Sequence, residues 1–228
     1  MRNILVIGGS SGIGLELVRQ IGESCRVWVA SRSAGPLASM GVAHLPLDVT
    51  RPDAQLTGLP DTLDGLVYCP GSVNLKPFKM LGVQNFQDDL EINFLGLVRI
   101  LQPLMPRFRE GSSLVFFSSV AVGKGMPFHT SVSASKGAIE GFARALAAEY
   151  APRIRVNVIA PSLVDTPLVA RMLNHEKKRE NLAGRHPLGR VGDPSEIARM
   201  AAFLLSQESS WMTGQVIGID GGISTLQT

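Results

Sequence analysis

The sequence predicts an α/β fold, a single domain built on a doubly wound parallel sheet of about seven strands with helices on both faces. Short apolar runs alternate with helical patterns along all 228 residues, and this alternation requires a parallel sheet with right-handed crossovers. The first apolar run, residues 4–7, is bounded by glycine and leads into a helix, as buried parallel strands do. Hydrophobic residues make up 45% of the chain and charged residues 18%, which suits a large buried core.

Composition excludes several classes of protein. The formal net charge of +3 is too small to predict a nucleic-acid partner. The two cysteines, Cys25 and Cys69, form neither a disulfide framework nor a metal-binding spacing. No apolar run reaches the ~18 residues of a membrane helix. Because the first strand pattern begins almost at Met1, we expect no signal peptide. Together with the cysteine pattern, this predicts a cytoplasmic protein without bound metal.

The first strand and helix enclose a glycine-rich turn with the sequence GGSSGIG. Its glycines allow a tight turn and a close approach of a ligand to the peptide N–H groups, and the helix that follows offers unpaired N–H donors and a positive dipole end. Glycine turns also close ordinary βα units, but here strand, turn and helix are all in place, which predicts a nucleotide diphosphate site. The predicted contacts are Gly8, Ser10, Ser11, Gly12, Ile13 and Gly14.

The second strand, residues 26–30, ends at Ser31 and Arg32 without an acidic residue. In a dinucleotide fold this position meets the adenosine ribose, where an acid binds the 2′-hydroxyl of NAD and an arginine suits the 2′-phosphate of NADP. The alternative is a solvated loop arginine. A third strand, residues 42–47, precedes Asp48 and Val49; Asp48 is either an adenine partner or a turn residue.

The middle of the chain continues the alternation. We expect brief helices in residues 33–41 and 50–64, a fourth strand at 63–68 that turns away at residues 69–71, and a long helix within 84–109. Asn93 lies inside that helix, where asparagine is unfavourable unless its side chain has a task. A fifth strand, 113–117, ends at Ser119. A loop at 120–131 then leads to a helix at 133–150 with Lys136 in its first turn.

The last third contains the predicted substrate loop. A sixth strand, 155–160, closes at Pro161, and residues 163–188 look irregular with helical pieces. Residues 171–190 hold six basic and two acidic side chains, a balance of +4 that either attracts an anionic substrate or is only a solvated face. A helix opens at Asp193 and continues to Leu205, and residues 215–219 form the last strand.

These residues together resemble the short-chain dehydrogenase/reductase family over nearly the whole chain. The family's TGxxxGxG turn matches residues 7–14 with Ile for Thr, its NxxG matches residues 93–96, and its strand-five serine matches Ser119. Its PGxxxT segment matches residues 161–166 with Ser162 for Gly, and its TGQ and DGG motifs match residues 213–215 and 220–222. The NNAG turn is replaced by residues 68–71. The resemblance implies a Rossmann-like fold.

The family's catalytic PxxxxYxxxK pattern departs at one position. Pro127 and Lys136 are in register, and the tyrosine position is Val132. In the family this tyrosine donates a proton to the carbonyl oxygen as hydride arrives, and the lysine lowers its pKa. Valine can neither donate nor accept a proton. In one hypothesis the protein remains a reductase in which Ser119 holds the carbonyl oxygen. The proton then comes from His129, or from Lys136 through a water chain with Asn93. The alternative for His129 is a surface-loop or packing histidine without a catalytic role.

Two further hypotheses stay open: a subunit or sensor that binds NADP(H) without redox turnover, and an enzyme of non-redox dehydration, isomerisation or cyclisation. The resemblance implies an NADP(H)-dependent oxidoreductase acting on a carbonyl or hydroxyl group of a small or carrier-bound substrate. The remaining predicted cofactor contacts are Ser31, Arg32, Asp48, Val49, Cys69, Pro70, Gly71, Lys136, Pro161, Val164 and Thr166.

The sequence also predicts a homo-oligomer, a tetramer or a dimer. The helix at 133–150 carries few charges, and family members commonly pair this helix and the preceding one across a two-fold axis. The face expected to pair consists of Ala134, Ala138, Phe142, Ala145 and Leu146.

Overall fold

A seven-stranded parallel sheet forms the centre of the molecule, as predicted. The structure is a computed structural model that describes residues 1–227. The strands follow the spatial order β3-β2-β1-β4-β5-β6-β7, and every neighbouring pair is parallel. They are β1 (Arg2–Ile7), β2 (Cys25–Ser31), β3 (Ala43–Pro46), β4 (Leu63–Tyr68), β5 (Phe108–Phe117), β6 (Ile154–Pro161) and β7 (Val216–Ile219).

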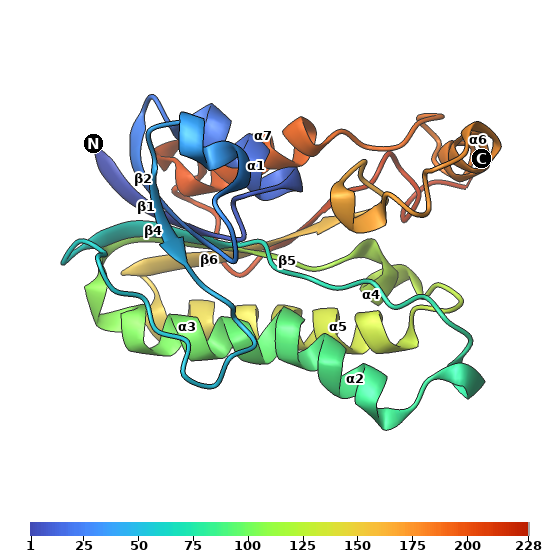
Figure 1. Cartoon of the computed structure of the whole chain (residues 1–228), viewed down its shortest axis with the longest axis horizontal. Helices are drawn as coiled ribbons and strands as arrows, with labels where there is room; N and C mark the ends of the chain where they lie inside the picture. Colours follow the sequence, from blue (N-terminus) through green and yellow to red (C-terminus); the bar gives the residue numbers. More distant parts are fainter. Residues whose placement is uncertain (228) are drawn as a thin grey trace.

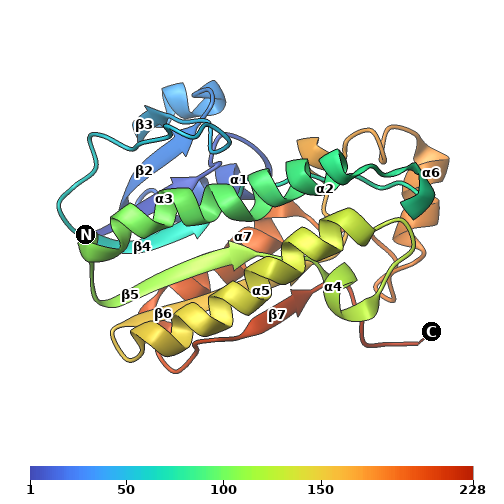
Figure 2. The same cartoon turned by 90° about the horizontal axis from the view of Figure 1, so that it is seen from below.

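Helices cover both faces of the sheet (Figure 1). One face carries α1 (Gly12–Ile21) and α7 (Pro194–Leu205), and the other carries α2 (Val83–Leu90), α3 (Gly96–Leu104) and α5 (Thr130–Tyr150). Figure 2, seen from below, shows this layer in front of the strands, with α5 packed along α2. Shorter helices are α4 (Val120–Lys124) and α6 (Glu176–Ala183), with 3₁₀ turns at Gly35–Ser39, Phe78–Met80, Met105–Arg107, Pro167–Val169 and Gln207–Ser209.

Strand β1 shows why the sheet is buried on both sides. Ile4 and Val6 belong to one apolar cluster, with α1 and α7, while Leu5 and Ile7 belong to the other, with α3 and α5. Since successive side chains of a strand point to opposite faces, a continuous apolar run is what two helix layers require. Within residues 1–227, no helix has the length and apolar character needed to cross a bilayer.

Three predicted boundaries are wrong. The segment 120–131 is not all loop, because Ser119 caps α4 by accepting a hydrogen bond from the backbone N–H of Ala121. Helix α5 begins at Thr130, three residues earlier than expected, so Lys136 lies in its second turn rather than its first. The expected long helix is interrupted by a π-helical segment, Glu91–Leu95, and ends before β5 begins at Phe108.

The residues of the predicted pairing face of α5 differ in burial. Leu146 is buried in the core, and the half-buried Phe142 packs edge-on against Phe94, with ring centroids 5.6 Å apart. Ala134 and Ala145 are exposed on the other side of the helix. Leu146 is therefore part of the core and is not available for pairing, whereas Ala134 and Ala145 remain at the surface.

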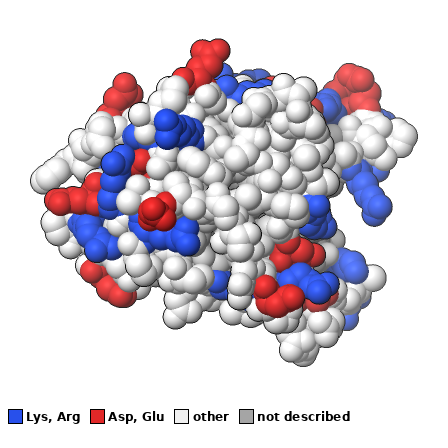
Figure 3. All heavy atoms as spheres, turned by 60° about the vertical axis from the view of Figure 1, so that its left-hand side comes forward, with Lys and Arg blue, Asp and Glu red and all other residues white. Residues whose placement is uncertain are grey.

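The chain order places a crevice at the middle of the sheet. It runs from β1 outward to β3, then returns to add β4 on the other side of β1. In doubly wound sheets, ligands bind beyond the carboxyl ends of the strands at this reversal. On the surface, the face in Figure 3 shows positive and negative side chains interspersed, with uncharged areas between them.

Candidate active site

The glycine-rich turn after β1 is shaped for a ligand that approaches the backbone closely. Gly8 and Gly12 have φ angles of +78° and +53°, a region that favours glycine. A Cβ atom on Gly14 would lie 2.5 Å from the carbonyl oxygen of Gly8, so no side chain fits there. Ser11, the N-cap of α1, is exposed, and its side chain makes no capping hydrogen bond. The helix therefore presents backbone donors and a free hydroxyl to the crevice.

The end of β2 presents one exposed cation to the same edge. Arg32 is exposed, whereas Ser31 is buried and donates a hydrogen bond from Oγ to the Ser33 carbonyl oxygen. Asp48 accepts hydrogen bonds from both Oγ1 and the backbone N–H of Thr50. These bonds, together with the charge of Arg32, lower the pKa of Asp48. Asp48 thus supports the turn through Oδ1, and Val49 is buried in the core.

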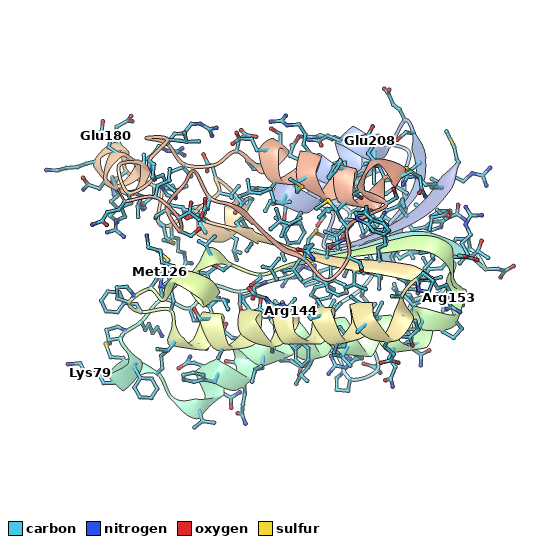
Figure 4. All side chains as sticks on the ribbon, turned by 180° about the vertical axis from the view of Figure 1, so that it is seen from behind. Lys79, Met126, Arg144, Arg153, Glu180 and Glu208 are labelled. Carbon is cyan, nitrogen blue, oxygen red and sulfur yellow. The ribbon has the colours of Figure 1, made fainter. Side chains whose placement is uncertain are left out.

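A cavity of about 400 Å³ joins the turn to the predicted substrate loop. Its lining is mainly apolar, as is usual for small-molecule sites. In Figure 4, Met126 lies between α5 and the segment that carries Glu180. The predicted site residues that line the cavity are Ile13, Cys69, Gly71, Ser119, His129, Val132, Lys136, Pro161, Val164 and Thr166.

Ser119 and Lys136 come from adjacent elements, the end of β5 and helix α5. The Ser119 oxygen accepts from the backbone N–H of Ala121 at 3.2 Å, which leaves its own proton available for another acceptor. Lys136 is 8% exposed, and its Nζ donates to the Phe117 carbonyl oxygen at 3.0 Å. Burial lowers the pKa of Lys136 to about 8. Burial also raises the pKa of the Cys69 thiol to about 12, so this side chain is neutral at pH 7.

Val132 lies in the cavity wall, one turn of α5 before Lys136, and no tyrosine stands in for it. The chain has two tyrosines, and neither lines the cavity. Tyr68 is 1% exposed and donates its hydroxyl to the Ile92 carbonyl oxygen at 2.7 Å, so burial raises its pKa strongly. Tyr150 is the last residue of α5, more than three turns beyond Lys136.

Asn93 lies in the π-helical segment, behind the cavity wall. Its side-chain oxygen accepts from the backbone N–H of Ser72 at 3.2 Å, and its amide donates to Ser72 Oγ and Ser135 Oγ, both at 3.0 Å. All three polar groups of the amide side chain are thus engaged within the protein. These contacts attach the segment after β4 to α5, which gives Asn93 the task that its position in the helix predicted.

Asp89 is a buried carboxylate that sequence reasoning missed. It is 0% exposed and accepts hydrogen bonds from Ser72 Oγ at 2.5 Å, Asn74 Nδ2 at 2.7 Å and Ser131 Oγ at 2.5 Å. Its negative charge raises the pKa of Lys136, partly opposing the effect of burial. The spacing in the sequence could have pointed to Asp89, because it precedes Asn93 by four residues and the two therefore lie on one helix face.

The two histidines at the cavity differ in their surroundings. His129 is half-buried, and its Nδ1 lies 2.7 Å from the Pro127 carbonyl oxygen. His186, which sequence reasoning did not select, is 6% exposed and contacts Ser162. Pro70 and Arg32 do not line the cavity. Within residues 1–227, no group of three or more His, Cys, Asp or Glu side chains is placed to hold a metal ion.

Comparison with known proteins identifies the family. The family model described as enoyl-(acyl carrier protein) reductase matches residues 10–224. The chain belongs to the short-chain dehydrogenase/reductase family. It is 32% identical to 3-oxoacyl-(acyl-carrier-protein) reductase FabG of Chlamydia trachomatis, over 98% of this chain and 97% of the relative. It is also 32% identical to cyclopentanol dehydrogenase of Comamonas sp., over 96% and 95%. A match to Thermotoga maritima FabG is 42% identical but covers 59% of this chain and 55% of that one.

Solved structures of the family superimpose on the whole chain. A short-chain dehydrogenase/reductase from Brucella melitensis has a TM-score of 0.89 and 28% identity, covering 99% of this chain and 97% of that one. A single-substitution variant of actinorhodin polyketide ketoreductase, solved with NADPH, has a TM-score of 0.86 and 26% identity, covering 99% and 98%. The chain is therefore an oxidoreductase of this family, a class that binds a nicotinamide cofactor.

Proposed function

We propose that the protein is an NADP(H)-dependent oxidoreductase that interconverts a carbonyl and a hydroxyl group on an apolar substrate, either small or carrier-bound. The observation that supports this most directly is the continuous cavity. It extends from Ile13 and Thr166 beside the glycine turn, past Ser119 and Lys136, to the apolar substrate loop. One space thus reaches the groups suited to a cofactor and those suited to a carbonyl.

The residues of the turn fit a dinucleotide diphosphate. The positive φ of Gly8 and Gly12 shapes the turn, and the absence of a Cβ on Gly14 lets α1 begin directly against the backbone of Gly8, so that the start of the helix can meet phosphate oxygens. Arg32 supplies an exposed guanidinium at the ribose end, which suits a 2′-phosphate. Lys136 holds the nicotinamide ribose in this proposal, and Pro161, Val164 and Thr166 flank the ring. When bound, the reduced nicotinamide supplies the hydride.

The lining of the cavity favours a substrate with an apolar body. Its wall includes Phe128, Leu168 and Met172, while Arg185 provides a positive charge. The relatives' names include a reductase of 3-oxoacyl groups on a carrier protein and a dehydrogenase of a cyclic alcohol. A ketone or thioester-linked oxoacyl group fits both the lining and these names, and Arg185 with the basic residues around it would attract an anionic carrier group.

Ser119 is proposed to hold the carbonyl oxygen through its free hydroxyl proton. At Val132 the cavity wall has no proton donor, so His129 and Lys136 remain the donors that the sequence analysis suggests. The low pKa of Lys136, about 8, makes its ammonium a stronger acid than an ordinary lysine. The site is thus proposed to retain carbonyl binding while its protonation chemistry differs from the family pattern.

The test is a panel of cyclic ketones and 3-oxoacyl thioesters, followed by the absorbance of NADPH and, separately, NADH. We expect NADPH consumption equal to product formed. Arg32→Ala should weaken NADPH binding by roughly tenfold to a hundredfold, corresponding to ~1.5–3 kcal/mol for a charge-assisted phosphate contact, and leave NADH binding unchanged. Product without NADPH consumption would support non-redox chemistry instead. Tight NADPH binding without turnover of any substrate would support a sensor or subunit.

A further inference from the structure

The wall of the cavity contains a serine–histidine pair at a position where the family pattern has glycine. Ser162 Oγ lies 2.9 Å from Nε2 of His186, and both side chains line the cavity together with Ser119 and Lys136. Ser162 follows directly on β6, and His186 comes from the substrate loop after α6. The structure thus brings together two groups that are 24 residues apart in the chain.

The second nitrogen of His186 determines its tautomer. Nδ1 lies 2.9 Å from the Leu182 carbonyl oxygen, which can only accept a hydrogen bond, so Nδ1 carries a proton. In the neutral ring, Nε2 is therefore bare and accepts the proton of Ser162. In the protonated ring, Nε2–H donates to Ser162 Oγ, and the serine proton is released toward another acceptor. Both protonation states keep both hydrogen bonds, as a proton relay requires.

Several charged groups surround the pair. Asp220, after β7, faces His186. Burial would raise the pKa of Asp220, but hydrogen bonds from Ser224 and Gly222, together with the charge of His186, lower it overall. Arg185 and Lys136 line the same cavity. Arg190 and Glu196 line an adjoining hollow and pair with each other at 2.6 Å. Asp220 is thus the carboxylate that lies toward the pair.

We propose that Ser162 and His186 form the proton relay that serves the substrate oxygen in this protein, in place of the missing tyrosine. The inference rests on the proposed reductase function, which supplies the hydride to the carbonyl carbon. As the substrate oxygen gains negative charge, the O–H bond of Ser162 breaks and the O–H bond of the product alcohol forms. The Nε2–H bond of His186 then breaks and restores the serine hydroxyl. Neutral His186 regains its proton from water, and the oxidation direction runs the same steps in reverse.

The test compares Ser162→Gly, Ser162→Thr and His186→Gln with His175→Gln, which changes an exposed histidine that does not line the cavity. Turnover in Ser162→Gly and His186→Gln should fall by ~10²–10⁴, the usual contribution of general acid catalysis, while the NADPH dissociation constant stays within about twofold. Ser162→Thr, which keeps a hydroxyl, should recover most of the rate. His175→Gln should behave as the wild type.

A second readout does not depend on turnover. Nitrogen NMR of the histidine side chains should show the Nδ1–H tautomer for His186, with an Nε2 resonance that moves in Ser162→Gly and not in His175→Gln. Wild-type activity that survives unchanged in Ser162→Gly and His186→Gln would overturn the relay but not the reductase. An unmoved Nε2 resonance would show that the pair does not exist in solution and would overturn it as well. A wild type that reduces no carbonyl would overturn both proposals.

Discussion

Replacing Asp89 by alanine should lower the free energy of unfolding by about 3 kcal/mol, whereas replacing its acidic neighbour in α2, Asp88, should have little effect. The carboxylate is fully buried and accepts from three side-chain donors, those of Ser72, Asn74 and Ser131. Ser131 Oγ can still donate to the Asn85 carbonyl oxygen at 3.1 Å, whereas the half-buried Ser72 and Asn74 lose their carboxylate acceptor. A hydrogen bond to a charged group contributes ~1.5–3 kcal/mol, so these two bonds give about 3 kcal/mol at the low end of that range. For a chain of this size, this corresponds to a melting temperature lower by roughly 6–12 °C.

Calorimetric melting with Asp88→Ala as the matched control would test the reasoning. Asp88 directly precedes Asp89 but is exposed, and it accepts one hydrogen bond, from Gln84 at 2.8 Å. Its replacement should therefore change the free energy of unfolding by no more than about 0.5 kcal/mol. Asp89→Asn keeps one acceptor oxygen and should fall between the two variants. Equal melting temperatures for Asp89→Ala and Asp88→Ala would refute the idea that the buried network holds the segment after β4.

Four further outcomes are expected. Val132→Tyr added to Ser162→Gly should recover much of the ~10²–10⁴ that Ser162→Gly alone loses, measured as kcat with NADPH, and no recovery would mean that a hydroxyl at position 132 does not reach the substrate oxygen. The rate should fall as pH rises through about 8, because burial lowers the pKa of Lys136 to that value and the ammonium proposed to hold the nicotinamide ribose is then lost; a rate flat from pH 7 to 10 would contradict this. Gly14→Ala should abolish NADPH binding or folding, since its Cβ would meet the Gly8 carbonyl oxygen, and unchanged binding would exclude the cradle. Light scattering should give a dimer or tetramer that Ala145→Arg, on the exposed side of α5, dissociates; a monomeric wild type would refute it.

The same lysine makes folding stability depend on pH. Its pKa is about 8 in the folded protein against 10.5 for an ordinary lysine, so the unfolded chain binds more protons between these values. The free energy of unfolding should therefore rise as pH increases from about 8 to 10.5. Lys136→Met should remove this part of the pH dependence, and a wild-type profile that falls over the same window would contradict the assignment.

The sheet and its connections could be predicted because they depend on local patterns. A buried parallel strand requires a continuous apolar run, which can be read in the sequence. The turn after β1 requires residues with positive φ angles, and glycines at these positions can be recognised in the sequence. The helix boundaries were predicted less accurately. The cap by Ser119 that starts α4 and the π-helical segment around Asn93 depend on hydrogen bonds that no periodicity reveals. The direction of Phe142 depends on its packing against Phe94, a residue of another helix.

The site could be predicted only where its residues follow one another in the chain. Ser119, Val132 and Lys136 were placed by motif spacing, and all three line the cavity. Asp89 and His186 were missed because their partners come from distant segments: Ser72 and Ser131 for one, Ser162 for the other. The roles of Asp89 and His186 depend on contacts between distant segments, and these contacts cannot be recognised from the sequence alone.

Two departures from the family pattern, at residues 132 and 162, lie in the cavity wall, and they separate two properties of the protein. The glycine turn is proposed to hold the cofactor, whereas Val132 and Ser162 line the cavity at the positions where the resemblance implies a tyrosine and a glycine. Since Gly14 acts through the close packing of the turn and Ser162 is proposed to act through a proton, the two should respond to different measurements. Substitution at Gly14 should change cofactor affinity, while substitution at Ser162 should change turnover at constant affinity. A protein that has lost redox chemistry would show the first response without the second.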